Sequence, residues 1–324
     1  LSHNFSWTPD CNRVRLQPYF VYFYAVDTNL TVGAVPLVDY ETVQIYVIAP
    51  APANLTAAAQ CNDMRICWDV ESCNPASNPC TGYKIYRKVN CSTWSPSTCE
   101  TGVPSYTGYV LAGETYHKDS TCFYDSNGGA GLTHGIDYSY RVVAKFQDGA
   151  LSRSSNEVCA RLRQDVPIIT NVDVTSTAVA TGTINIKWIS PLGGVGAGNF
   201  LDTVANPGPY EYRLYRSAGF VNAVTLIQTF TATYFAGTAG ITSYTSFTDS
   251  NLNTQDNPYT YRIEFYVNGS SFCKTQNASS VYLDCAPTDN ALNLTWQAQV
   301  PWTNTTYEVW KRIPPPSGAL VLIA

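Results

Sequence analysis

The sequence predicts an all-β protein built from tandem copies of one small domain, and three observations carry that prediction. Segments such as YKIYR at 83–87 alternate with period two, which is typical of strands. Three similar segments end in Trp68, Trp188 and Trp296, which lie 120 and 108 residues apart, a spacing typical of whole domains. No long stretch shows the 3.6-residue periodicity of an amphipathic helix.

Each copy opens with a strand that places two apolar residues and a tryptophan at alternate positions. The three examples are MRICW at 64–68, INIKW at 184–188 and LNLTW at 292–296. A second strand follows each: YKIYR at 83–87, YRLYR at 212–216 and YEVWKR at 307–312. In YKIYR, alternation puts Tyr83, Ile85 and Arg87 on one face and Lys84 and Tyr86 on the other.

The first two copies continue with two further shared segments. A Phe-x-Asp-Ser-Asn segment, at 123–127 and 247–251, precedes a Tyr-x-Tyr-Arg strand, at 138–146 and 259–267. The shared order of four segments indicates that these copies have the same fold.

The composition indicates an extracellular protein. Charged residues make up 13% of the 324 residues, about half the usual ~25% for a soluble protein. A net charge of -5 argues against nucleic acid and anionic membranes as partners. No apolar run approaches the ~20 residues of a membrane helix, so we expect no membrane insertion.

The eleven cysteines favour disulfides in an oxidising compartment over a metal site. Seven of them lie between 61 and 122, and the sequence has no Cys-x-x-Cys and only three scattered histidines. We therefore expect no metal and no cofactor.

Longer segments carry a family resemblance. SNEVCARLRQDVPIITNVDV (155–174), GPYEYRLYRSAGF (208–220) and the run from Ala278 to Arg312 resemble the fibronectin type III region of large Bacteroidetes surface proteins. Those proteins carry gliding-motility-associated, type IX secretion sorting domains. The resemblance implies tandem Ig-like β-sandwiches at the cell surface or outside the cell. It implies these core residues: Trp68, Trp188, Trp296, Tyr138 and Tyr259.

The resemblance also sets the expected domains. Residues 1–49 resemble the C-terminal part of a cadherin- or PKD-like β domain. Residues 50–164 and 165–283 are the first two fibronectin type III-like domains, and 284–324 are the first half of a third. Short proline-containing linkers at 50–54 and 163–167 predict stiff joins.

Two weak local motifs add candidate sites. Ala-Val-Asp at 25–27 resembles a cadherin calcium motif, with Asp39 and Glu41 near in sequence, although a solvated Asp27 at a strand end is the favoured interpretation. Ser120 and Thr203 lie in Asp-Ser/Thr-apolar motifs that resemble Bacteroidetes O-glycosylation sites.

The resemblance makes the strands of Cys67 and Cys122 neighbours. Alternation from the inward Trp68 and Phe123 points both cysteines outward, so we expect a Cys67–Cys122 bridge. The partner of Cys11 is expected upstream. The remaining expected bridges pair Cys73, Cys80, Cys91 and Cys99 between the loops flanking 83–87, with Cys80–Cys91 least favoured, and Cys273 with Cys285.

These features predict a non-enzymatic structural and adhesive stalk segment, whose partners are other surface proteins, glycans or copies of itself. Trp94, Trp302 and Trp310 are candidates for stacking on sugars, although packing between domains is favoured. Two alternatives stay open. One is a spacer module of a secreted polysaccharide-degrading enzyme. The other is a filament subunit in which residues 319–324 add a strand to another copy, whereas the favoured account of the half-domains is that the chain continues at both ends.

Overall fold

The computed structural model describes residues 3–27, 35–129, 131–196, 198–233, 245–302, 304, 306–313 and 318–323. The described helices are three single turns of 3-10 helix: η1 (Cys11–Arg13), η2 (Ser105–Thr107) and η3 (Asn127–Gly129). Within these ranges no helix has the length and apolar character to cross a membrane. The chain divides into two compact units, 1–165 with 197–200, and 166–196 with 201–324.

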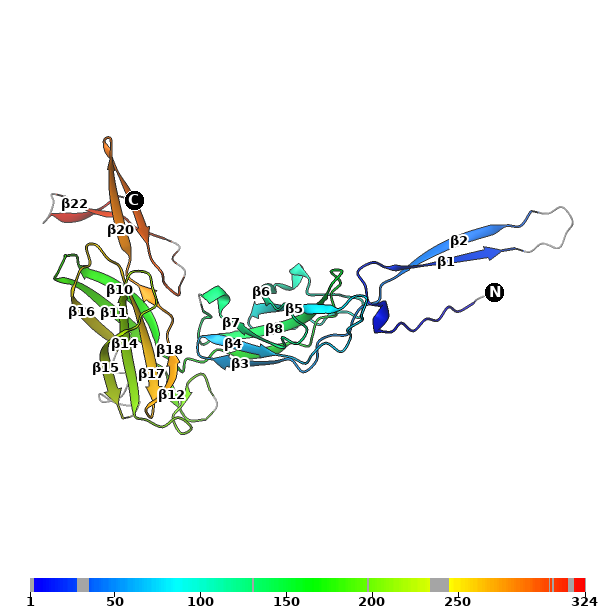
Figure 1. Ribbon diagram of the computed structural model, residues 1–324, viewed down its shortest axis with the longest axis horizontal. Helices are drawn as coiled ribbons and strands as arrows, with labels where there is room; N and C mark the ends of the chain where they lie inside the picture. The colour runs from blue at the N-terminus through cyan, green and yellow to red at the C-terminus, as the bar shows by residue number, and fades with distance from the viewer. Residues whose placement is uncertain are drawn as a thin grey trace. The chain divides into compact units, whose positions relative to one another are not determined.

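The first unit contains a sandwich of a three-stranded and a four-stranded antiparallel sheet (Figure 1). The smaller sheet has the order β3-β4-β7, with strands β3 (Thr56–Gln60), β4 (Asp63–Cys67) and β7 (Cys122–Asp125). The larger sheet has the order β6-β5-β8-β9, with strands β6 (Val110–Glu114), β5 (Cys80–Val89), β8 (Asp137–Phe146) and β9 (Val158–Arg161).

The second unit repeats this arrangement. Its smaller sheet has the order β10-β11-β16, with strands β10 (Ile168–Ser176), β11 (Gly182–Ile189) and β16 (Ser246–Leu252). Its larger sheet has the order β15-β14-β17-β18, with β19 (Ala278–Ser279) also paired to β17. The strands are β15 (Thr225–Ala232), β14 (Tyr210–Ala218), β17 (Tyr259–Val267) and β18 (Ser270–Lys274). A short parallel pair, β12 (Gly193–Gly194) and β13 (Leu201–Asp202), lies outside these sheets.

In both units a three-stranded antiparallel sheet faces a larger one whose four main strands have the same order, to which the second unit adds the short β19, and this arrangement defines fibronectin type III-like sandwiches. The predicted all-β, tandem Ig-like fold is therefore confirmed. In both units the smaller sheet carries the tryptophan strand, and the two repeated tyrosine strands pair with each other in the larger one.

The repeated tryptophans and tyrosines form equivalent core contacts. Trp68 meets Tyr83 edge-on with ring centroids 5.1 Å apart, and Trp188 meets Tyr212 in the same way at 6.0 Å. All four side chains are buried. The predicted alternation is thereby confirmed, because Ile85, two residues beyond Tyr83, is also fully buried while Lys84 is partly exposed.

The predicted core positions Tyr138 and Tyr259 are buried as well, with their hydroxyls bonded to nearby backbone. The Tyr138 hydroxyl accepts a hydrogen bond from the backbone nitrogen of Thr133 at 2.9 Å, and that of Tyr259 accepts one from Asn253 at 3.1 Å. Each bond satisfies a buried hydroxyl and fixes the turn before the strand.

The repeated arginine, aspartate and second tyrosine form a polar clamp between the two sheets. In the first sandwich, both carboxylate oxygens of Asp125 accept from Nη1 of Arg87, at 2.8 and 2.9 Å. The Tyr140 hydroxyl donates to Oδ2 of Asp125 at 2.9 Å. Burial, followed by the neighbouring Asp125 carboxylate, raises the pKa of Tyr140, so its phenol stays protonated and donates.

The second sandwich contains the same clamp. Asp249 accepts from Nη1 of Arg216 at 3.0 and 2.9 Å, and from the hydroxyl of Tyr261 at 2.9 Å. The clamp explains why Tyr-Arg, Phe-x-Asp and Tyr-x-Tyr recur together: each segment supplies one member.

Two-stranded elements lie at both ends of the described chain. In the first unit β1 (Tyr19–Val26) pairs with β2 (Val38–Ile45). In the second, β20 (Tyr282–Thr288) pairs with β21 (Ala291–Gln297), and β22 (Trp310–Ile313) with β23 (Ala319–Leu322). The expected core residue Trp296 is 39% exposed, because β21 pairs only with β20 and no second sheet of the described chain covers it. Within the expected strand run at 319–324, β23 pairs with β22 of its own chain.

Candidate functional site: the tethered face of the first sandwich

The predicted bridge between Cys67 and Cys122 is present. The two residues are directly opposite in the β4–β7 ladder, with Cα atoms 4.1 Å apart. Outward alternation from the buried Trp68 placed Cys67 on the same face as Cys122, as expected.

The expected pairings of the other cysteines in this unit are wrong, since Cys73 is bonded to Cys11. The expectation that the partner of Cys11 lies upstream is therefore also wrong, and the N-terminal segment lies against the sandwich. There Val14 is buried, its carbonyl accepts from Nδ2 of Asn78 at 3.2 Å, and the backbone nitrogen of Leu16 donates to Asp148 at 2.7 Å.

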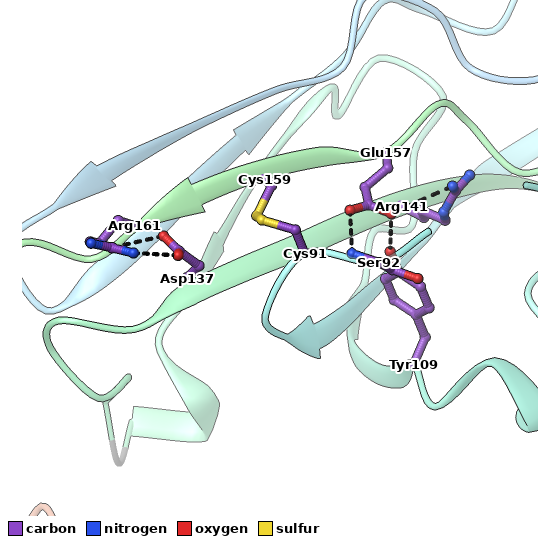
Figure 2. The surroundings of a disulfide bond; sticks show 8 residues. All are labelled: Cys91, Ser92, Tyr109, Asp137, Arg141, Glu157, Cys159 and Arg161. Carbon is purple, nitrogen blue, oxygen red and sulfur yellow. Dashed lines mark hydrogen bonds and ion pairs between the residues drawn. A yellow bond between two sulfur atoms is a disulfide. The ribbon is translucent and has the colours of Figure 1, made fainter. Parts of the chain in front are cut away.

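Cys91 is bonded to Cys159, with Cα atoms 5.6 Å apart (Figure 2). Cys91 follows the end of β5, where the backbone nitrogen of Asn90 donates to the carbonyl of Asp137 at the start of β8. This crossing carries Cys91 past β8 to β9, where Cys159 lies opposite Ser139. The bridge therefore ties the loop after β5 to the last strand of the sheet.

The remaining expected bridges are also wrong, because Cys80, Cys99 and Cys285 are free. Cys80 is buried at the start of β5, and its thiol donates to the carbonyl of Gly82 at 3.5 Å. Cys99 is exposed in the loop after β5. Because Cys285 is free, it is not joined to Cys273; Cys285 lies in the β20–β21 pair and Cys273 in β18 of the sandwich sheet.

Arg141 on β8 is the centre of a polar cluster beneath the tethered loop (Figure 2). Its side chain is almost fully buried, with Nη1 donating to the carbonyl of Ser155 and Nη2 to that of Trp94, both at 2.6 Å. The Trp94 ring lies 4.6 Å from the guanidinium carbon, a cation–π contact. One face of the Trp94 ring, which was a candidate for stacking on sugars, is thus packed against the protein's own arginine.

Glu157 on the approach to β9 completes this cluster. One carboxylate oxygen accepts from the backbone nitrogen of Ser92 at 2.7 Å, and the other from the hydroxyl of Tyr109 at 3.0 Å. That second oxygen also lies 3.6 Å from Nη2 of Arg141. A charge, two hydrogen bonds and the neighbouring Cys91–Cys159 bridge hold the loop at both of its ends.

An exposed ion pair lies on the other side of the bridge (Figure 2). Arg161 donates to Asp137 through Nε at 2.8 Å and through Nη2 at 2.5 Å. This bidentate contact lowers the pKa of Asp137 and keeps the carboxylate charged. The site consists of groups of complementary charge that hold the loop and β9 in place, so its role is structural.

The remaining predicted sites lie apart from this cluster. Asp27 follows β1, and its backbone nitrogen donates to the carbonyl of Leu37 at 2.8 Å. In the part of the chain that the structure describes, no group of three or more His, Cys, Asp or Glu residues could hold a metal ion. Ser120 and Thr203 are partly buried, and the Thr203 hydroxyl donates to the carbonyl of Gly194 at 2.9 Å.

The other two tryptophans differ from Trp94 in their surroundings. Trp302 is partly buried against the core of the second sandwich. Trp310 is 50% exposed, and its ring nitrogen donates to Glu308 at 3.0 Å.

The sequence interpretation missed the cluster around Arg141. A signal was present, since the Tyr-x-Tyr-Arg segment places an arginine in a strand that the tyrosines predict to be buried. A charge in such a strand requires a partner.

Comparisons with known proteins add little to this picture. No protein-family model matches the chain, and no curated protein matches it. A crystal structure of the FN1–FN3 domains of chicken CNTN1 is similar with a TM-score of 0.27 and 12% identity, over 76% of this chain and 70% of that one. The strand order within each unit remains the basis for the fold.

Proposed function

We propose that this chain is a non-enzymatic structural and adhesive segment of an extracellular multidomain protein. The supporting observation is the covalent and polar tethering of the first sandwich, which holds its loops and N-terminal segment to a folded core. Disulfides form and persist mainly in oxidising surroundings, which supports a location outside the cytosol.

The more specific proposal, on the cell surface and the process involved, rests on the sequence. The longer repeated segments resemble surface proteins of Bacteroidetes that leave the cell by type IX secretion. We therefore place the protein on the outer surface of such a cell, in gliding or adhesion.

The way in which the bridges shorten the chain supports a role in resisting mechanical force. In the oxidised protein the shortest covalent path from Cys11 to Cys159 uses two bridges and the 18 residues from Cys73 to Cys91. The reduced chain has 148 residues over the same span. At ~3.3–3.6 Å per extended residue, reduction releases about 430–470 Å of chain.

Single-molecule stretching from the two ends of the chain tests this role. We expect the oxidised protein to resist extension and to release at least about 430 Å more when reductant is added under load. A Cys99→Ser variant, which removes a free thiol, is the matched control and should behave like the wild type. Full extension of the oxidised chain at forces that also extend the reduced chain would contradict this mechanical role.

A further inference from the structure

The loop that leads into β5 contains two buried cysteines in different chemical states. Cys73 is bonded to Cys11, whereas Cys80, seven residues further along the chain, is a free thiol. Both side chains belong to the core of the first sandwich, with exposed fractions of 0% and 6%. A free thiol that can reach a disulfide can replace one of its two cysteines by exchange.

Hydrogen bonds within the loop bring the two cysteines close together. The backbone nitrogen of Cys80 donates to Oδ1 of Asn74, the residue after Cys73, at 2.9 Å. The backbone nitrogen of Cys73 donates to Oε1 of Glu71 at 2.8 Å, and that of Glu71 donates to the hydroxyl of Tyr83 on β5 at 2.8 Å. The loop is therefore closed on itself beside the start of β5. Only a short rearrangement separates its ends from the Cα distance of about 4.4–6.8 Å that a disulfide requires.

The two possible bridges of Cys73 depend on different parts of the fold. The bridge to Cys11 is supported by the packing of the N-terminal segment, where Val14 is buried and its carbonyl accepts from Nδ2 of Asn78 at 3.2 Å. A bridge to Cys80 needs none of these contacts. Once the segment is loosened, ring size decides between the partners. A spacing of seven residues in place of 62 favours the bridge to Cys80 by about 25-fold.

We propose that Cys80 is a second partner of Cys73, and that the Cys11–Cys73 bridge is a latch which internal thiol–disulfide exchange opens. The Cys80 thiol loses its proton to water, its sulfur attacks Sγ of Cys73, and the bond from Cys73 to Cys11 breaks. Cys11 leaves as a thiolate and takes up a proton. One disulfide and one thiol are present before and after, so no oxidant or reductant is consumed. The product releases the N-terminal segment from its covalent attachment to the loop.

The closed sandwich keeps this latch shut. Burial raises the pKa of the Cys80 thiol, and only a thiolate attacks a disulfide, so exchange requires that the contacts of the N-terminal segment open first. In the exchanged form the shortest covalent path from Cys11 to Cys159 includes the 62 residues up to Cys73 and the 11 from Cys80 to Cys91, instead of 18 residues. This inference goes beyond the proposed mechanical role and does not depend on it.

The test locates the free thiol by mass spectrometry. The oxidised full chain is held in mildly alkaline buffer with urea below the concentration that unfolds the first sandwich, then acidified, unfolded and alkylated with N-ethylmaleimide. Trypsin gives a Cys11 peptide that ends at Arg13, whereas Cys73 and Cys80 share the peptide 66–84. Label on Cys80 marks the resting bridge, and label on Cys11 in a detached peptide marks the exchanged one. We expect urea to raise the labelled fraction of Cys11 by about tenfold or more.

Two variants identify the attacking thiol. Cys80→Ala should abolish the labelling of Cys11, whereas Cys99→Ser, the matched control, removes another free thiol and should leave the labelling unchanged. A Cys11→Ser variant tests the second bridge in the folded protein. With oxidised glutathione, its Cys73 and Cys80 should bond to each other, and the peptide 66–84 should lose the mass of two hydrogen atoms.

Four results would overturn the proposal. Cys11 could stay unlabelled at every urea concentration, or its labelling could persist in Cys80→Ala. Cys73 and Cys80 could stay unbonded to each other in Cys11→Ser. Cys80 could be found bonded to Cys11, which would mean that the attack falls on the other sulfur of the bridge.

Discussion

The two sandwiches contain the same clamp, but they differ in what packs on the outer face of the larger sheet. In the first, Arg141 on β8 is buried beneath the loop that Cys91 and Cys159 tether, with the Trp94 ring against it. In the second, the equivalent Arg262 on β17 lies beside the Tyr215 ring at 5.0 Å and pairs with Glu264 at 3.2 Å. The equivalent arginine therefore anchors an added loop in the first copy, whereas in the second it contacts side chains of the sheet itself.

This difference separates what the fold requires from what one copy has added. The clamp joins the two sheets, so its three residues recur wherever the sandwich recurs. The tether depends on the loop between β5 and β6, and its cysteines recur nowhere else. The following predictions test this division.

Removal of the clamp carboxylate should have the largest effect. Asp125→Ala leaves the Arg87 guanidinium and the Tyr140 hydroxyl without their partner in a buried site, at a cost of about 3–5 kcal/mol. Asp249→Ala should cost somewhat less, because the side chains of Asp249 and Arg216 are 9% and 28% exposed against 1% and 15% for Asp125 and Arg87. Calorimetry of each variant measures both losses.

The control for these variants keeps the carboxylate and removes one donor. Tyr140→Phe and Tyr261→Phe each lose a single hydrogen bond to a charged acceptor and should cost about 1.5–3 kcal/mol. If the aspartate variants cost less than the phenylalanine variants, the carboxylate is not the centre of the clamp.

Removal of the Cys91–Cys159 bridge should rank next and should affect only the first sandwich. The bridge spans 68 residues, so the chain-entropy model gives about 4 kcal/mol for the double variant Cys91→Ser with Cys159→Ser. Thermal denaturation monitored by calorimetry should show a lower unfolding temperature for the first unit and an unchanged one for the second. An equal shift in both transitions would show that the bridge does not act locally.

Much of the fold was predictable from the sequence because alternation and repetition report directly on strands. The buried positions of Trp68, Trp188, Tyr138 and Tyr259 follow from the resemblance to fibronectin type III domains, and Cys67–Cys122 follows from that resemblance together with period-two alternation. The other bridges were not predictable in this way. Cys11–Cys73 and Cys91–Cys159 join segments that the chain brings together only through tertiary contacts, and local spacing carries no information on such pairs.

The aromatic contact on the buried arginine gives a smaller effect that sharpens the same comparison. Trp94→Ala removes a desolvated cation–π contact with Arg141 and should destabilise the first sandwich by about 2 kcal/mol. Tyr215→Ala removes the more distant and more exposed contact with Arg262 and should cost about 0.5–1 kcal/mol. Urea denaturation measures both losses of stability. A larger loss for Tyr215→Ala would mean that the contact between ring and arginine contributes more in the second sandwich than in the first, the reverse of what we expect.

The smallest expected effect is a pH dependence of the stability of the first sandwich. Lys145 and Lys84 lie 2.5 and 3.7 Å from the carboxylate of Glu114 on β6. The hydrogen bond from Lys145 is the main cause of a lowered pKa at Glu114. A lowered pKa means that the folded protein favours the charged form. The stabilisation is therefore complete above the unfolded value of about 4.3 and is lost as the pH falls through the folded value.

Glu114→Gln isolates this contribution. At neutral pH the variant should be less stable than the wild type by at most about 1 kcal/mol, because the pair is partly exposed to solvent. Urea denaturation at a series of pH values should show the difference between the two proteins shrinking below about pH 4.3. Lys145→Met removes the main donor, so Glu114→Gln on that background should give a smaller and flatter difference. A wild-type advantage that persists unchanged in strong acid would show that Glu114 acts through packing instead of charge.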